Sequence, residues 1–149
     1  SFDHLTFFCL PDKVDFCGSE LHGCQFAVCR IGGISFGYSR IYDTEFYSSV
    51  LSHVDMYEAT LAHTRFHDCE LSHLMVQNAT LKSCHTADCT MDEVDYAGST
   101  LDGCTFSRIT AGTVCLDWTT ITQGGATEEE CRQNRKDVYR ALGVKGDAA

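Results

Sequence analysis

Large apolar residues occupy every fifth position over most of this chain. The series is interrupted only by Thr86 and Ala111, and it runs through Phe16, Leu21, Phe26, Ile31, Phe36, Ile41, Phe46, Leu51, Met56, Leu61, Phe66, Leu71, Val76, Leu81, Met91, Tyr96, Leu101, Phe106, Leu116 and Ile121. An amphipathic helix would show a period near 3.6 and a half-buried strand a period of 2, so neither pattern fits. A period of five predicts a repeat architecture.

A second class of residues, mostly small, lies two positions before each member of the first. Residues two apart on an extended chain point the same way, so both classes should face one interior. The charged residues test this register. Between Val14 and Thr122 there are 14 acids and 5 bases, and all of them fall on the three positions that should face outward.

A period of twenty is superimposed on the period of five. The second inward class is unusually bulky at positions 20 apart, namely Val14, Ile34, Val54, Leu74, Val94 and Val114. Four units of five therefore make one coil, and equivalent residues of successive coils should stack in columns, as in Phe26, Phe46 and Phe66. Each coil of such a solenoid buries its faces only against its neighbours.

The units VDFCG, SELHG, CQFAV and CRIGG, which begin at Val14, resemble the A-(D/N)-L-x-x repeat of the pentapeptide-repeat proteins. The resemblance extends over residues 14–122 without a gap, although the first position of each unit is seldom Ala here. It implies an all-β fold, a right-handed quadrilateral parallel β-helix with four pentapeptides per coil and about 5.5 coils. The period of twenty independently supports this fold.

The two ends depart from the repeat. Residues 1–13 contain apolar side chains that are out of phase by one with the repeat that begins at Val14, and we expect them to form a partial coil and cap that shifts register at Pro11. The solenoid should span residues 14–122. In residues 123–149 a loop should lead to a C-terminal α-helix, because Thr127 and Glu130 fit a capping box and Gly143 fits its end.

The predicted helix carries a narrow apolar stripe of Cys131, Val138, Tyr139 and Leu142. This stripe could cover the end of its own solenoid, or it could pair with a second protomer in a homodimer. The pattern leaves both arrangements open.

Composition limits the function. The formal net charge of −10 argues against direct nucleic-acid binding, because phosphates need a basic surface. The chain has neither an apolar run of about 18 residues nor the layout of a secretory signal, so we expect no membrane association. Six of the ten cysteines take the small inward position, which predicts free core thiols in a reducing cytoplasm. These are Cys24, Cys29, Cys69, Cys84, Cys89 and Cys104.

No catalytic motif is present. The sequence lacks a glycine-rich phosphate loop, a nucleophile elbow and an HExxH pair, and we therefore expect neither an enzyme nor a cofactor. His53, His73 and Glu93 should form an outward ladder on successive coils. Zinc accepts such ligands, but a ladder on a convex surface does not converge on one ion, so a solvated ladder without metal is the expectation.

One side of the predicted solenoid is strongly acidic. It carries five acids and no base: Asp15, Asp55, Glu58, Asp95 and Asp117. Three tyrosines, Tyr38, Tyr42 and Tyr57, should point outward on this side and the adjoining one. Tyrosines among acids are typical of a protein-binding patch. The same residues would also serve solubility and exposed strands.

Two functions remain open. The first is a non-enzymatic interaction module, such as an adaptor or an effector domain, that presents the acidic, Tyr-containing surface to a protein partner. The second is implied by the resemblance to quinolone-resistance (Qnr-type) members of the family: a DNA-mimicking regulator of DNA gyrase, a type II topoisomerase, conferring quinolone or toxin protection. The sequence is similar to these in its acidic side and C-terminal helix, but it is shorter and lacks their loop insertions.

Overall fold

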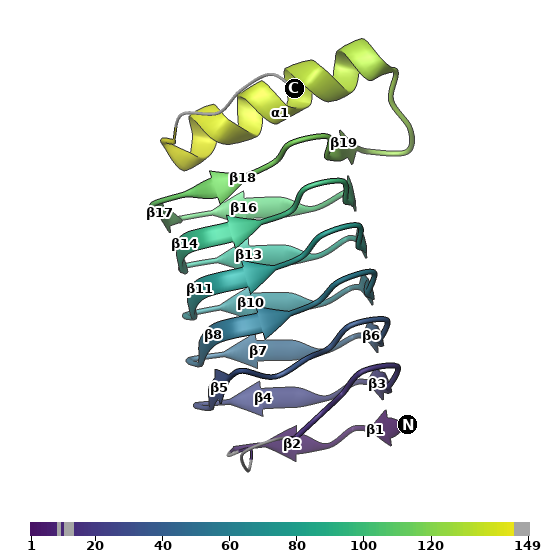
Figure 1. The fold of residues 1–149 in the computed structure, drawn as a ribbon, viewed down its shortest axis with the longest axis vertical. Coiled ribbons are helices and arrows are strands. Elements are labelled where there is room, and N and C mark those ends of the chain that lie inside the picture. The colour runs from purple at the N-terminus through teal and green to yellow at the C-terminus, as the bar shows by residue number, and fades with distance from the viewer. Residues whose placement is uncertain (9, 11–13, 145–149) are drawn as a thin grey trace.

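The chain winds into a tower of short parallel strands closed at one end by a helix (Figure 1). The computed structural model describes residues 1–8, 10 and 14–144. Within these residues about six coils stack on one another, and α1 (Glu128–Leu142) lies across the last coil. The parallel β-helix with a C-terminal helix that the sequence predicts is confirmed.

Three sides of the tower are parallel sheets. Sheet A contains β1 (Phe2–Asp3), β3 (Glu20–His22), β6 (Arg40–Tyr42), β9 (Thr60–Ala62), β12 (Thr80–Lys82), β15 (Thr100–Asp102) and β19 (Thr120–Thr122). Sheet B contains β2 (Thr6–Phe7), β4 (Gln25–Ala27), β7 (Glu45–Tyr47), β10 (Arg65–His67), β13 (His85–Ala87) and β16 (Thr105–Ser107). Sheet C contains β5 (Arg30–Gly32), β8 (Val50–Asp55), β11 (Glu70–Met75), β14 (Thr90–Asp95), β17 (Thr110–Ala111) and β18 (Val114–Cys115).

The fourth side consists of tight turns. The backbone N–H of Ser39 donates to the carbonyl of Phe36 at 3.1 Å, and Ala59 donates to Met56 at the same distance. The residue before each donor has a positive φ, 57° at Tyr38 and 53° at Glu58, as the third position of a type II turn requires. Left-handed residues recur at the other corners too, so each five-residue unit ends by turning the chain.

Successive coils pair with an offset of twenty residues. Phe26 lies opposite Phe46 in the next coil, and Phe46 opposite Phe66. The first coil differs, because Phe7 pairs with Phe26 at an offset of nineteen. This is the one-residue phase difference that the sequence predicts. Its expected location, Pro11, lies outside the described residues.

The interior is filled by stacked columns of apolar side chains. The rings of Phe26, Phe46 and Phe66 are nearly parallel, with centroids 4.5 Å and 4.8 Å apart. The neighbouring Phe36 meets Phe46 edge-on at 6.0 Å. Phe46 has no exposed surface. From Phe26 to Phe66 the interior therefore combines apolar burial with favourable aromatic geometry.

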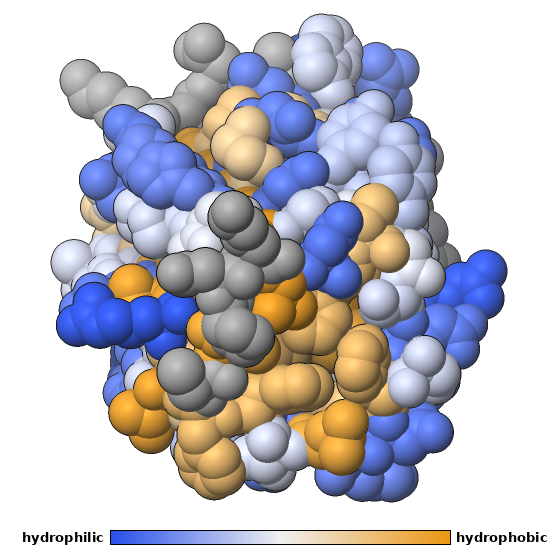
Figure 2. Space-filling model, turned by 60° about the horizontal axis from the view of Figure 1, so that its bottom comes forward, coloured by the Kyte–Doolittle hydropathy of each residue, from blue (hydrophilic) through white to orange (hydrophobic). Residues whose placement is uncertain are grey.

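The N-terminal end of the tower presents apolar surface. Figure 2 shows hydrophobic residues gathered over this end. Leu5 and Phe8 are 45% and 67% exposed, while Phe2 and Phe7 are partly buried against the core. The end differs from the opposite one, where a helix covers the last coil.

Helix α1 lies on the last coil and binds its free backbone groups. Thr127 and Glu130 form the predicted capping box, and Gly143 ends the helix in a left-handed conformation. The hydroxyl of Tyr139 accepts a hydrogen bond from the Leu116 N–H at 2.6 Å. A guanidinium nitrogen of Arg135 donates to the Thr119 carbonyl at 2.8 Å. The helix thus supplies partners that a further coil would otherwise provide.

We expect Phe46→Ala to lower the free energy of unfolding by about 3–5 kcal/mol, because it opens a cavity between two stacked rings. Tyr47→Ala on the same strand, whose side chain points outward, is the matched control and should cost less than half as much. Urea unfolding followed by circular dichroism measures both. Similar losses for the two variants would contradict the assigned interior.

Tyr139→Phe should destabilise the last coil by about 1–3 kcal/mol, because the buried Leu116 N–H loses its acceptor. Hydrogen exchange at the Leu116 amide should become faster, and thermal unfolding should shift downward. Tyr47→Phe removes a hydroxyl that makes no described hydrogen bond and should change neither measurement. Unaltered exchange at Leu116 would show that the contact is not made in solution.

Candidate functional site

The fourth side of the tower, called here the acidic side, brings together the acids that the sequence assigned to it. Asp55 and Asp95 both pair with Met75 in the intervening coil, so they belong to one column. Ser35, bridged to Asp55, continues that column toward Asp15. Asp55 and Asp15 are exposed and Asp95 is half-buried.

The aspartates of this column also shape the turns that follow them in the same coil. One carboxylate oxygen of Asp55 accepts a hydrogen bond from the N–H of Tyr57 at 2.8 Å. Asp15 and Asp95 accept from the residues two positions later at the same distance, and Ser35 uses its hydroxyl in the same way. Side chains of this kind stabilise tight turns locally. This role was not predicted from the sequence, although a column limited to Asp and Ser on most coils was a signal of it.

A small aromatic and acidic cluster lies on two adjacent coils of the acidic side. Tyr38 is 58% exposed, and its ring lies 5.9 Å from that of Tyr57 in an edge-on arrangement. The negative charge of the nearby Glu58 carboxylate is the main reason why the pKa of the Tyr38 hydroxyl is raised. Tyr38, Tyr57, Glu58 and Asp55 therefore form one continuous surface of rings and carboxylates.

Other predicted site residues lie apart from this cluster. Tyr42 lies on sheet A, where its ring is 5.1 Å from that of His22. Asp117 lies at the C-terminal end of the acidic side, beside Trp118. Of the apolar stripe on α1, Cys131, Tyr139 and Leu142 are buried against the chain's own last coil, and Val138 is half-buried.

Trp118 is an exposed aromatic residue that sequence analysis did not single out. Its side chain is 71% exposed, and its φ is 58°, a value that bulky residues rarely adopt. It lines a cavity of about 360 Å³ beside Arg132 and Arg135 of α1. A lone tryptophan at the left-handed position of a repeat was the available signal, because that position faces outward.

The predicted ladder of His53, His73 and Glu93 is present. The two imidazole rings stack with centroids 4.3 Å apart, and His73 Nδ1 lies 2.6 Å from a Glu93 carboxylate oxygen. Within residues 1–8, 10 and 14–144, no three His, Cys, Asp or Glu side chains are grouped so that they could hold a metal ion.

The cysteines at inward positions are mostly buried, and Cys69, Cys84, Cys89 and Cys104 among them are free thiols. These thiols donate to backbone carbonyls, as in the contact from Cys69 to Phe46 O at 3.2 Å. Hydrogen bonding with Cys89, together with burial, raises the pKa of the Cys69 thiol, and Cys104 has the same effect on Cys84. The Cys69 and Cys84 thiols therefore stay protonated and serve as small core groups.

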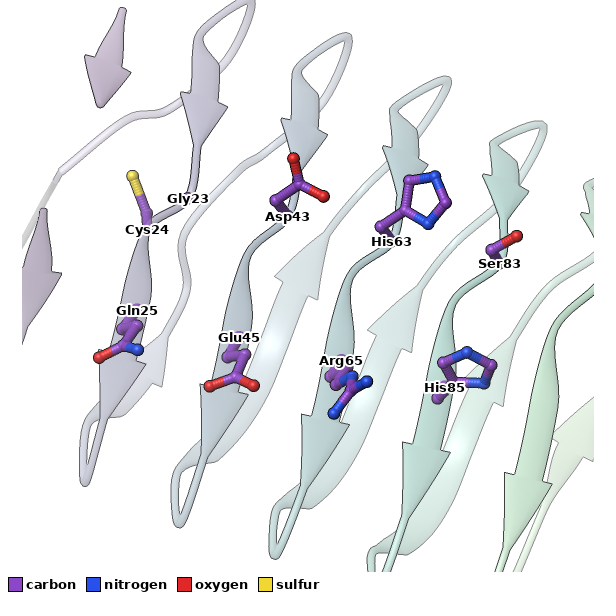
Figure 3. A pocket seen from close by; sticks show the side chains of 9 residues that line it. All are labelled: Gly23, Cys24, Gln25, Asp43, Glu45, His63, Arg65, Ser83 and His85. Carbon is purple, nitrogen blue, oxygen red and sulfur yellow. The ribbon is translucent and has the colours of Figure 1, made fainter. Parts of the chain in front are cut away.

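A polar pocket lies at the corner between sheets A and B, and we call it the corner pocket. Figure 3 shows its two columns of side chains on four successive coils. Its volume is about 360 Å³, and it is lined by Gly23, Cys24, Gln25, Asp43, Glu45, His63, Arg65, Ser83 and His85. Sheet A separates this pocket from the acidic side.

A family profile described as the pentapeptide repeat region matches residues 19–96, just over half of the chain. The chain belongs to the pentapeptide-repeat family. The match covers the cluster of Tyr38, Tyr57, Glu58 and Asp55 and every residue that lines the corner pocket. No curated protein matches this pentapeptide-repeat chain in sequence.

Several solved structures are similar to this pentapeptide-repeat protein at low identity. Rfr23, a pentapeptide-repeat protein from the cyanobacterium Cyanothece 51142, is 14% identical with a TM-score of 0.47, covering 70% of this chain and 86% of its own. HetL, involved in heterocyst differentiation regulation in Nostoc sp. strain PCC 7120, is 14% identical with a TM-score of 0.47, covering 79% of this chain and 56% of its own. A trypsin-treated variant of QnrB1, a plasmid-mediated fluoroquinolone resistance protein, is 16% identical with a TM-score of 0.41, covering 98% and 83%.

The described part of this pentapeptide-repeat protein contains no helix with the length and apolar character needed to span a bilayer. Helix α1 has 15 residues, and its first turn carries three glutamates.

The turn function of Asp55 can be separated from its charge. We expect Asp55→Ala to lower the free energy of unfolding by about 1 kcal/mol, because the Tyr57 N–H loses its acceptor. Asp55→Asn keeps an acceptor oxygen, and its free energy of unfolding should be close to that of the parent protein. Chemical unfolding of the three proteins gives the comparison. If the Asp55→Ala and Asp55→Asn variants were equally stable, the hydrogen bond would not stabilise this turn.

Proposed function

We propose that this pentapeptide-repeat protein is a non-catalytic interaction module that presents its acidic side to a protein partner with a basic surface. The observation that carries the proposal is the distribution of charge. The acidic side holds Asp15, Asp55, Glu58, Asp95 and Asp117 and no Lys or Arg between residues 14 and 122. A row of one sign on a rigid surface steers a partner of opposite charge and fixes its orientation.

The aromatic cluster adds a contact that does not depend on charge alone. Tyr38 and Tyr57 present ring surface beside Glu58, and exposed tyrosines are enriched where proteins bind each other. The short turns hold both rings on a backbone that is hydrogen-bonded between coils, since the Tyr38 N–H donates to the Tyr57 carbonyl at 2.9 Å. The partner therefore meets a surface that needs little ordering on binding.

A DNA-mimicking regulator of a type II topoisomerase is the second candidate. The observation in its favour is the regular column of Asp15, Asp55 and Asp95, whose carboxylates recur on alternate coils about 10 Å apart along the tower. A protein that normally holds DNA phosphates offers a basic channel of the kind such a column would fit.

The proposal is tested with two charge-matched double variants. Asp55→Asn with Glu58→Gln removes two charges from the acidic side and keeps the turn acceptor. Asp68→Asn with Glu70→Gln removes two charges elsewhere. We expect the first pair to weaken capture of partner proteins by about tenfold, and the second to leave it near the parent level. Quantitative mass spectrometry of proteins captured on the immobilised chain measures this, and equal capture by both variants would refute the proposal.

The second candidate has its own readout. The purified protein is added to a DNA gyrase supercoiling assay with and without a quinolone. The DNA-mimic function predicts inhibition or quinolone protection at micromolar protein that is lost in Asp55→Asn with Glu58→Gln and kept in Asp68→Asn with Glu70→Gln. Absence of any effect would remove gyrase as the target and leave the interaction module intact.

A further inference from the structure

A ligand in the corner pocket can be bound only by side chains. Its floor is the backbone at the corners of successive coils, and the amides there are already bound. Glu45 N–H donates to Cys24 O at 3.0 Å, Arg65 N–H to Thr44 O at 2.9 Å and His85 N–H to Thr64 O at 3.1 Å. A ligand in this pocket must therefore be held by the two columns that Figure 3 shows.

Arg65 differs from two other arginines in comparable positions. Arg40 lies one coil above Glu20 and forms an ion pair with it at 3.0 Å, and Arg108 pairs with Asp88 in the same relation at 2.6 Å. Arg65 lies directly above Glu45 in sheet B, but it makes no ion pair within 4 Å with any residue that the structure describes. Its exposed guanidinium keeps its donors available.

Two histidines line the same pocket as this guanidinium. His63 precedes Arg65 by two residues on the same coil, and His85 pairs with Arg65 on the next coil. His85 Nδ1 lies 2.5 Å from the Thr105 hydroxyl oxygen, and no hydrogen bond of its Nε2 is described. Three side chains that can donate hydrogen bonds thus line the pocket on two adjacent coils. A tetrahedral phosphate accepts from several directions, whereas a planar carboxylate is satisfied by one guanidinium.

The preceding coil has the opposite charge. Asp43 and Glu45 line the same pocket one coil away, about 4.8 Å along the tower. The pocket therefore has an anionic half and a cationic half within the length of a small zwitterion.

We propose that the corner pocket binds a phosphate monoester that carries an ammonium group on a short linker. The phosphate oxygens accept from Arg65, His63 and His85, and the ammonium group lies against Asp43 and Glu45. This site is independent of the acidic side, from which sheet A separates it, and it does not rest on the proposed protein partner.

The test is a titration followed by NMR of the His63 and His85 ring protons. The probes are O-phosphoethanolamine, inorganic phosphate, ethanolamine and the diester glycerophosphoethanolamine, at concentrations up to about 10 mM. We expect O-phosphoethanolamine to bind about fivefold more tightly than inorganic phosphate, because it adds an ammonium contact. Ethanolamine should shift neither ring, and the diester should bind more weakly because it lacks one anionic oxygen.

Variants assign the contacts. Arg65→Gln should weaken phosphate binding about tenfold or more, and Arg40→Gln, which removes a paired charge from sheet A, should leave it unchanged. Asp43→Asn with Glu45→Gln should remove the preference for O-phosphoethanolamine over inorganic phosphate. All substituted side chains are exposed or half-exposed, and thermal unfolding checks that the fold is kept.

Three results would overturn the proposal. The first is that neither histidine responds to O-phosphoethanolamine. The second is that Arg40→Gln weakens binding as much as Arg65→Gln. The third is that O-phosphoethanolamine binds no more tightly than inorganic phosphate, or no more tightly than the diester. The first of these outcomes would indicate general anion attraction, and the second a lipid-type headgroup, instead of the proposed ligand.

Discussion

The hydrogen bonds and stacked side chains between successive coils are the interaction on which this structure depends. A strand of two to six residues cannot be stable alone, and here each one pairs only with the coils above and below. The offset of twenty residues stacks similar side chains on one another, so Phe26, Phe46 and Phe66 form one continuous column. Where the column is interrupted by Thr86, the backbone pairing continues, because the ladder requires the register and not a particular side chain.

The same register organises the surface. Residues twenty apart lie next to each other on the outside, and a charge that recurs at this interval becomes a column. The acidic column is also structural, because Asp15, Asp55 and Asp95 each accept a hydrogen bond from the turn that follows in the same coil. One side chain can therefore contribute to stability and to recognition, and only a substitution that retains the acceptor, such as Asn, separates the two.

The two ends of the solenoid differ in how their unpaired backbone groups and apolar surface are covered. At the C-terminal end, Tyr139, Arg135 and Asn134 of α1 bind backbone groups of the last coil, so a helix replaces the missing strands. At the N-terminal end, Leu5 and Phe8 of the first coil are 45% and 67% exposed. A solenoid terminus leaves apolar surface and strand edges unless another element covers them.

The sequence by itself determined the period, the inward and outward positions, the stacking columns and the capping box of α1. Each of these depends on local chemistry or on a regular interval, which a single chain displays directly. The tertiary structure decided which outward residues interact. It showed that α1 packs on its own last coil, that the aspartates bind turn amides, that Trp118 borders a cavity beside α1, and that Arg65 makes no described ion pair above Glu45 while Arg40 pairs with Glu20. These outcomes depend on side-chain conformations and on contacts between distant coils, and an interval in the sequence does not specify either.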